Sequence, residues 1–182
     1  MIEPVFIITI VAESLLGAGL IITLLKPGSR LWPPPGKNSW QFWYVWATTI
    51  IATVGLFWLS FLDWDSWFFH HWARYIPAAI LIAGGTFSAL WGVSSLSLHN
   101  SLGLKGRLIT SGAYRYTRNP QYAGDIAITL GILIAANSFL VFIAGALAVI
   151  LFVLTPFTEE PWLQERFKTD YNQYKARVPR FI

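Results

Sequence analysis

The sequence predicts an all-α integral membrane protein of about five transmembrane helices, with a C-terminal helical hairpin and an amphipathic cytoplasmic C-terminal segment. Its composition, its apolar segments and its charge distribution all point to this fold. Of the 182 residues, 55% are hydrophobic and 12% are charged, which is about half the charged share of a typical soluble domain. One soluble core of this size cannot bury so much apolar surface. Lipid is therefore the expected solvent.

The first three spans are expected at residues 4–25, 40–62 and about 76–96. Each is an apolar run long enough to cross the hydrocarbon core, because 22 helical residues cover about 33 Å. The first run has no basic segment before it and is too long for the apolar part of a signal peptide. We therefore expect a retained transmembrane helix at the N-terminus.

Residues 122–157 form an apolar stretch that is too long for one ordinary span. Asn137 and Ser138 interrupt it near the middle. The pattern predicts a tight hairpin of two short helices, 122–136 and 139–157.

Residues 158–182 are polar and amphipathic, so we expect a cytoplasmic helix that lies on the membrane surface or caps the bundle. Thr155 or Thr158 is expected to cap the start of this helix, with Pro161 near its first turn. The whole chain, 1–182, is expected to form a single membrane domain.

The basic residues predict the orientation of the chain. Twelve of the thirteen Lys and Arg residues fall in segments 26–39, 97–121 and 158–182, and only Arg74 lies outside them. The positive-inside rule then places the N-terminus outside and the C-terminus in the cytoplasm. The expected location is the cell membrane of a bacterium or archaeon. Trp residues are amphipathic and are expected at both membrane interfaces: Trp32, Trp40 and Trp43 at the inner one, and Trp58, Trp64, Trp67 and Trp72 at the outer one.

The chain has no Cys and only three His, so neither a disulfide nor a metal site is expected. No nucleic-acid partner is expected, and the sequence leaves the oligomeric state open. The expected partners are the membrane and a lipid or lipophilic substrate.

Most of the polar residues lie in two segments, 99–125 and 155–180, which flank the two open ends of the hairpin. A hairpin brings its ends together, and polar groups that converge at the mouth of an apolar bundle are a binding-site hypothesis. The residues expected to meet there are Tyr114, Arg118, Asn119, Tyr122, Glu159 and Glu160.

Residues 110–124, TSGAYRYTRNPQYAG, resemble the pattern T-x-G-x-Y-x-x-x-R-H/N-P-x-Y-x-G of the isoprenylcysteine carboxyl methyltransferase and phospholipid methyltransferase superfamily. Residues 159–180 resemble its second pattern, E-E-x-x-L-x-x-x-F-G-x-x-Y-x-x-Y-x-x-x-V-P-R. The resemblance covers about residues 99–182. It implies a membrane enzyme that transfers a methyl group from S-adenosyl-L-methionine to a lipid-like substrate.

The resemblance also implies roles for particular residues. A carboxylate suits the ammonium group of the cofactor, aromatic rings suit its sulfonium, and Arg118 suits its carboxylate. The implied catalytic residues are Arg118, Glu159 and Glu160. The implied cofactor-binding residues are His99, Arg107, Leu108, Ile109, Tyr114, Asn119, Pro120, Gln121, Tyr122, Glu159 and Glu160.

Three positions depart from the superfamily pattern. Asn119 stands where many relatives have His, and Lys168 stands where the second pattern has Gly. Carboxyl-methylating relatives have an Arg four residues before the functional Glu, where this chain has Thr155 or Pro156. An amine, a thiol or another neutral nucleophile is therefore a better acceptor than a prenylcysteine carboxylate.

Other interpretations stay open. Arg118, Tyr122, Gly124 and Asp125 also resemble a turn of NADPH-dependent sterol reductases, and a non-catalytic membrane protein on the same fold is a third possibility. Asp125 is expected either to orient Arg118 or to cap a helix. Glu13 is a functional candidate because it is an ionisable residue inside a span, unless Ser14 or Thr9 merely solvates it.

Overall fold

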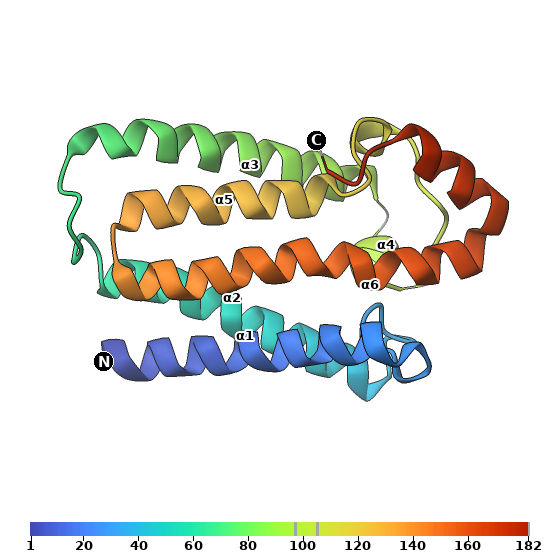
Figure 1. Ribbon diagram of the computed structural model, residues 1–182, viewed down its shortest axis with the longest axis horizontal. Helices are drawn as coiled ribbons and strands as arrows, with labels where there is room; N and C mark the ends of the chain where they lie inside the picture. The colour runs from blue at the N-terminus through green and yellow to red at the C-terminus, as the bar shows by residue number, and fades with distance from the viewer. Residues whose placement is uncertain (97, 105, 182) are drawn as a thin grey trace.

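Every regular element of the described residues is a helix in the computed structural model of the chain (Figure 1). The structure describes residues 1–96, 98–104 and 106–181, without the side chains of residues 27, 98 and 99. The predicted all-helical class is confirmed for this part of the chain.

Four of these helices are long and apolar enough to cross a membrane, and a fifth, α5, is apolar but has only 17 residues. The five are α1 (Ile2–Leu25), α2 (Trp40–Leu62), α3 (Tyr75–Ser95), α5 (Pro120–Ala136) and α6 (Phe139–Arg177). The short elements are η1 (Pro27–Ser29), η2 (Trp72–Arg74), α4 (Leu98–Ser101) and η3 (Gly112–Arg115). The chain is thus built as a multi-pass membrane protein.

The predicted hairpin is present as α5 and the first half of α6. Asn137 adopts a left-handed conformation with φ 45° and ends α5, as Asn and Gly commonly do at helix C-termini. The Ser138 hydroxyl accepts a hydrogen bond from the Val141 amide at 3.0 Å and caps α6. The Asn137 amide also donates to Asp65 at 2.9 Å, which ties the hairpin turn to the loop after α2.

The expectation of a separate, capped C-terminal helix is wrong. α6 continues from Phe139 to Arg177 through Pro156 and Pro161. The hydroxyls of Thr155 and Thr158 donate to carbonyls of the preceding turn and cap nothing. Because these prolines do not stop the helix, its apolar first half leads directly into the polar segment.

The chain changes direction at Lys168, whose φ of 44° and ψ of −115° are not helical. Beyond it the last part of α6 turns back over the end of the bundle (Figure 1). Lys168 occupies the position where the superfamily pattern has Gly, and Gly adopts a positive φ without steric cost. The backbone therefore explains why that pattern has Gly at the bend.

Helices α3 and α5 lie side by side (Figure 1), and their backbones approach closely at Gly85 and Gly124. A Cβ on Gly85 would lie 2.6 Å from the carbonyl oxygen of Gly124. Only residues without a side chain permit this approach. It holds the start of α5 firmly against α3.

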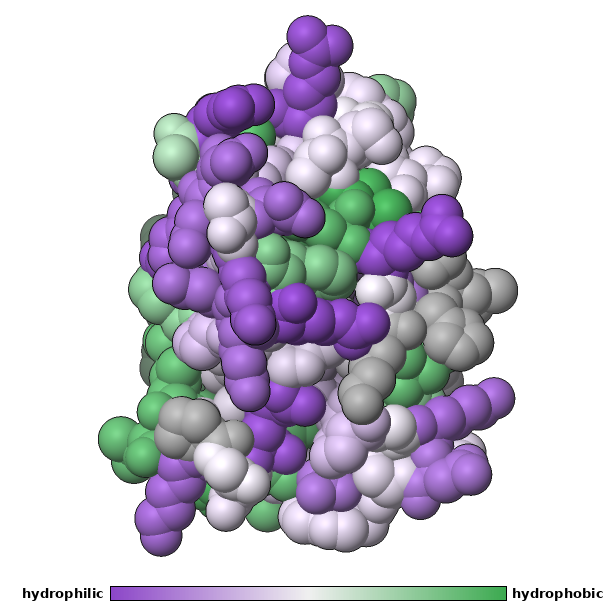
Figure 2. All heavy atoms as spheres, turned by 90° about the vertical axis from the view of Figure 1, so that its right-hand side faces the viewer, coloured by the Kyte–Doolittle hydropathy of each residue, from purple (hydrophilic) through white to green (hydrophobic). Residues whose placement is uncertain are grey.

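The loops between α1 and α2 and between α3 and α5, together with the end of α6, gather at one end of the bundle (Figure 1). These are the segments with twelve of the thirteen basic residues. Figure 2 shows this end, where hydrophilic side chains surround a smaller apolar zone. We call it the basic end; the N-terminus and the hairpin turn lie at the other end.

Candidate functional site

A cavity of about 460 Å³ opens between α1, α2, α5 and α6 and extends to the loops of the basic end. Its size is that of a small-molecule site, and such sites are mostly apolar with a few placed polar groups. The predicted site residues that line it are Arg107, Leu108, Ile109, Tyr114, Arg118, Asn119, Gln121, Tyr122, Glu159 and Glu160.

Two predicted cofactor contacts are not among these lining residues. Pro120 begins α5, and its carbonyl accepts a hydrogen bond from the Ser88 hydroxyl of α3 at 2.8 Å. The His99 side chain lies outside the described part of the chain.

Glu159 holds the polar groups at the head of the cavity together. Its Oε1 accepts hydrogen bonds from the Trp32 indole nitrogen, at 2.6 Å, and from the Tyr122 hydroxyl. Its Oε2 has no partner among the described residues and belongs to a side chain that lines the cavity. The contacts of Oε1 thus hold the carboxylate in place, while Oε2 makes no such contact with the described residues.

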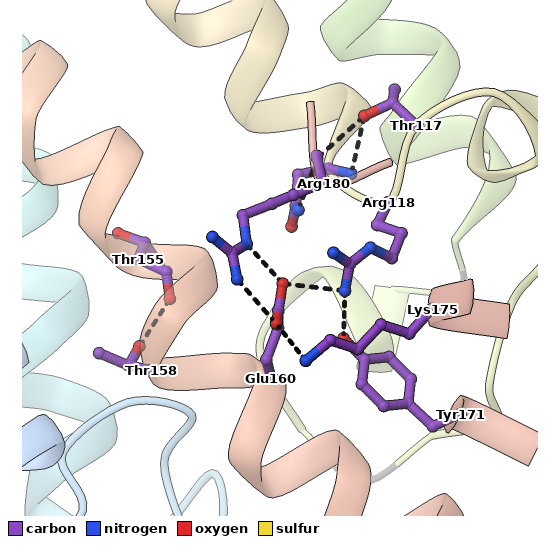
Figure 3. Close-up of polar contacts among 9 residues, drawn as sticks. Thr117, Arg118, Thr155, Thr158, Glu160, Tyr171, Lys175 and Arg180 are labelled. Carbon is purple, nitrogen blue, oxygen red and sulfur yellow. Dashed lines mark hydrogen bonds and ion pairs between the residues drawn. The ribbon is translucent and has the colours of Figure 1, made fainter. Parts of the chain in front are cut away.

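Glu160, the next residue, faces three cations of the chain itself (Figure 3). Its Oε1 lies 2.9 Å from Arg118 Nη1 and 2.6 Å from Arg180 Nε. Its Oε2 lies 3.0 Å from Arg180 Nη2 and 3.2 Å from Lys175 Nζ. We call Glu160, Arg118, Lys175 and Arg180 the Glu160 cluster. It joins α6, the loop before α5 and the C-terminal tail.

Backbone hydrogen bonds continue this junction. The Arg118 amide donates to the Pro179 carbonyl at 2.9 Å, and the Asn119 side-chain amide donates to the Arg180 carbonyl at 2.9 Å. The Tyr174 hydroxyl donates to the Tyr114 carbonyl at 2.7 Å. The tail and the end of α6 therefore close over the cavity as a lid.

The side chains in and beneath the lid are held in one protonation state, Tyr114 as a neutral phenol and Arg180 as a cation. Burial raises the pKa of the Tyr114 phenol, and the nearby Glu159 carboxylate raises it further, so this side chain stays a neutral hydrogen-bonding group. The hydrogen bond to Glu160 raises the pKa of Arg180, which stays a cation. Arg118 lies mostly buried, and its Nε has no partner among the described residues. This Nε is a donor that a bound anion can use.

The structure brings together the groups that the hairpin argument predicted. Tyr122 bonds to Glu159, and Arg118 pairs with Glu160. Trp32 was missed, because a Trp in a Pro-rich loop was expected at the membrane interface. It is instead buried, with 8% of its surface exposed, against Glu159. No local signal distinguishes it from the other nine Trp residues, since only packing decides which loop lies over the cavity.

The contacts of two acidic side chains, Asp125 and Glu13, differ from those that the sequence suggested. Asp125 lines the cavity, and within the described part of the chain it neither contacts Arg118 nor caps a helix. Glu13 is buried, and both of its carboxylate oxygens lack a partner among the described residues. The Thr9 hydroxyl does not solvate Glu13, because it donates to the Val5 carbonyl at 2.8 Å.

A bundle of apolar helices that encloses a mostly apolar cavity with a few placed polar groups defines a class: multi-pass membrane proteins with a small-molecule cavity. Comparison with known proteins identifies the family within this class. The sequence model of the phospholipid methyltransferase family matches residues 73–170, from η2 into the end of α6. This chain belongs to that family.

One curated relative is the phosphatidylethanolamine N-methyltransferase of the yeast Yarrowia lipolytica (strain CLIB 122 / E 150). It is 32% identical over 186 aligned positions, which cover 88% of this chain and 18% of the relative. The chain therefore spans about one fifth of the length of that relative. No solved structure matches this chain. Because the relative is eukaryotic, the comparison does not support the expected bacterial or archaeal membrane.

Proposed function

We propose that this chain is an integral membrane methyltransferase that uses S-adenosyl-L-methionine and methylates a lipid or lipophilic acceptor. The observation that carries the proposal is the Glu159 carboxylate at the head of an apolar cavity, whose Oε1 is held by Trp32 and Tyr122 and whose Oε2 has no partner among the described residues. Membership of the phospholipid methyltransferase family supports the reaction class. The relative from Yarrowia lipolytica is a phosphatidylethanolamine N-methyltransferase, which supports an amine as the acceptor.

The residues at the head of the cavity carry groups that are complementary to those of the cofactor. Glu159 Oε2 would accept a hydrogen bond from the amino-acid ammonium. Arg118 Nε, which has no partner among the described residues, would donate to the carboxylate of the cofactor. The rings of Tyr114 and Tyr122, which line the same space, would lie beside the sulfonium. S-adenosylmethionine supplies an electrophilic methyl group on sulfur when it is bound.

The chain itself has to align the acceptor and exclude water. Fixed alignment of two reactants lowers a barrier by about 7–11 kcal/mol. Glu160 acts as a positioning residue in this scheme, because its carboxylate is engaged with Arg118, Lys175 and Arg180 and holds the lid. The long apolar wall of the cavity suits acyl chains, which would enter from the bilayer.

The basic end is proposed to face the cytoplasm, with the N-terminus outside. Two loops and the end of α6 meet at this end and carry twelve of the thirteen Lys and Arg residues, as the positive-inside rule requires. The cavity head would then receive S-adenosylmethionine from the cytoplasm and lipid from the inner leaflet.

An NADPH-dependent reductase is the main rival, because the turn from Arg118 to Asp125 resembles those enzymes. A non-catalytic protein on the same fold is the second rival. The family match favours neither of them.

Calorimetric titration of the purified protein with S-adenosylhomocysteine and with NADPH separates these proposals. We expect binding of S-adenosylhomocysteine alone. Glu159→Gln should weaken it at least tenfold, because hydrogen bonds to charged groups contribute about 1.5–3 kcal/mol. The exposed Glu165→Gln is the matched control and should bind like the wild type.

Binding of NADPH instead would favour the reductase, and binding of neither ligand would favour the non-catalytic protein. Equal affinities of Glu159→Gln and Glu165→Gln would remove Glu159 from the cofactor site.

A further inference from the structure

Asp125 lies on the cavity wall one helical turn beyond the Tyr122–Glu159 contact. Both Tyr122 and Asp125 belong to α5 and line the cavity. Residues three apart in a helix share a face and are separated by about 4.5 Å along the axis. Asp125 is thus the first ionisable group that an acceptor meets below the head of the cavity on this helix.

The Asp125 carboxylate has no hydrogen-bond or ion-pair partner among the described residues. The described basic residues that line the cavity are Arg107 and Arg118, both from the loop segment before α5. Arg118 is already paired with Glu160. A carboxylate in apolar surroundings is costly without a compensating charge. A cationic ligand would supply that charge.

Two further residues that line the cavity suit a small cation. On α6, Thr155 lies one turn before Glu159, where it contributes a hydroxyl and no positive charge. From α2, Trp46 contributes an aromatic ring, and its edge contact with Trp32 at 6.4 Å places it near the Glu159 site. Aromatic rings bind methylated ammonium groups. The pocket can therefore hold an amine before and after methylation.

Glu13 is a weaker candidate for the same role. Gly17 of α1 packs against Leu151, which lies one turn deeper than Thr155 on α6. Glu13 is a further turn along α1, so it lies about two turns deeper than Asp125. That distance separates Glu13 from the Tyr122–Glu159 contact at the head of the cavity.

We propose that Asp125 binds the ammonium headgroup of an aminolipid and accepts a proton from its nitrogen. This inference rests on the proposed methyltransferase function and assigns its acceptor subsite. The proton moves from nitrogen to the Asp125 carboxylate, and the freed lone pair forms the N–C bond. The C–S bond of the donor breaks, its electron pair stays on sulfur, and a neutral thioether and a methylated ammonium result.

The first test measures binding of the acceptor without the cofactor. Thermal unfolding of the purified protein is followed with short-chain phosphatidylethanolamine and with its N-acetyl derivative, which keeps the phosphate charge and lacks the ammonium charge. We expect the amine lipid to raise the Tm of the wild type more than the N-acetyl lipid does. Asp125→Asn should abolish this difference, Asp125→Glu should restore part of it, and the exposed Asp170→Asn should retain it.

The second test measures methyl transfer to the same amine lipid. Loss of a general base costs about 10²–10⁴-fold in rate, so Asp125→Asn should lower the rate at least 100-fold. The affinity of Asp125→Asn for S-adenosylhomocysteine should stay within about twofold of the wild type, since the residues proposed to bind the cofactor are unchanged. Asp170→Asn should transfer methyl groups at the wild-type rate.

An Asp125→Asn protein that still prefers the amine lipid and keeps its rate would overturn the proposal. Transfer only to the N-acetyl lipid or to a thiol would overturn it too, while the methyltransferase function would stand. A wild type that does not bind S-adenosylhomocysteine would instead refute the proposed function. If Asp125→Asn does not fold, Asp125→Ser, which also lacks the charge, is judged by the same criteria.

Discussion

Glu160 illustrates how one buried carboxylate organises the lid. It contacts Arg118, Lys175 and Arg180, which come from the loop before α5, the end of α6 and the tail. The side chains of both Glu160 and Arg118 are 9% exposed. A buried ion pair is weak evidence of net stabilisation, but removing one partner leaves the other charge buried and alone.

We therefore expect Glu160→Gln to destabilise the fold by about 3–5 kcal/mol, the usual cost of breaking a buried ion pair. The measurement is the unfolding midpoint of the purified protein in detergent. The exposed Glu165→Gln serves as the control and should unfold like the wild type. Identical midpoints for the two variants would show that the cluster does not hold the lid.

At the scale of elements, the close approach of α3 and α5 sets the position of α5, which forms one wall of the cavity. α5 carries Tyr122 and Asp125, and it begins directly after the loop that supplies Arg118. A shift of α5 away from α3 would move these side chains relative to α6. The two adjacent residues Gly84 and Gly85 allow this dependence to be tested, because only Gly85 faces α5.

Gly85→Ala should lower the unfolding free energy by about 1–3 kcal/mol, the usual cost of overpacking. Its new methyl group would lie 2.6 Å from the Gly124 carbonyl oxygen and 2.9 Å from the Ile128 amide nitrogen. Gly84→Ala meets nothing within 4 Å, so it should be neutral or stabilise the helix by up to about 1 kcal/mol. Denaturant titration of both variants measures the difference, and the reverse order would contradict this packing.

At the scale of the whole molecule, the gathering of basic loops at one end predicts the orientation in the membrane. The chain contains no Cys, so single cysteines can report which end faces outward. Ser66 lies exposed in the loop after α2, and Gln173 lies exposed near the end of α6.

We expect an impermeant maleimide to label Ser66→Cys in intact cells and Gln173→Cys only after the membrane is permeabilised. A detergent-solubilised sample, in which both should react, controls for local reactivity. Labelling of Gln173→Cys alone in intact cells would invert the proposed topology and place the cofactor site outside.

The sequence by itself determined the helices and the reaction class. Apolar runs and the Asn137-Ser138 interruption predicted the helical hairpin, because hydrophobic length and turn residues are local properties. The two patterns at 110–124 and 159–180 predicted the superfamily, and the family match agrees. Connectivity predicted that Tyr122 lies near Glu159, since a hairpin brings its two ends together, and the structure adds the hydrogen bond between them.

Only the tertiary structure decided which groups complete the site. Trp32 reaches Glu159 across 127 positions of sequence. Asp125 has no partner in the described part of the chain because of the residues that surround it in space, not those next to it in sequence. Likewise, α6 passes through two prolines and bends at Lys168 instead. These outcomes depend on packing between distant segments, and the free energy of such contacts is not encoded in any local pattern.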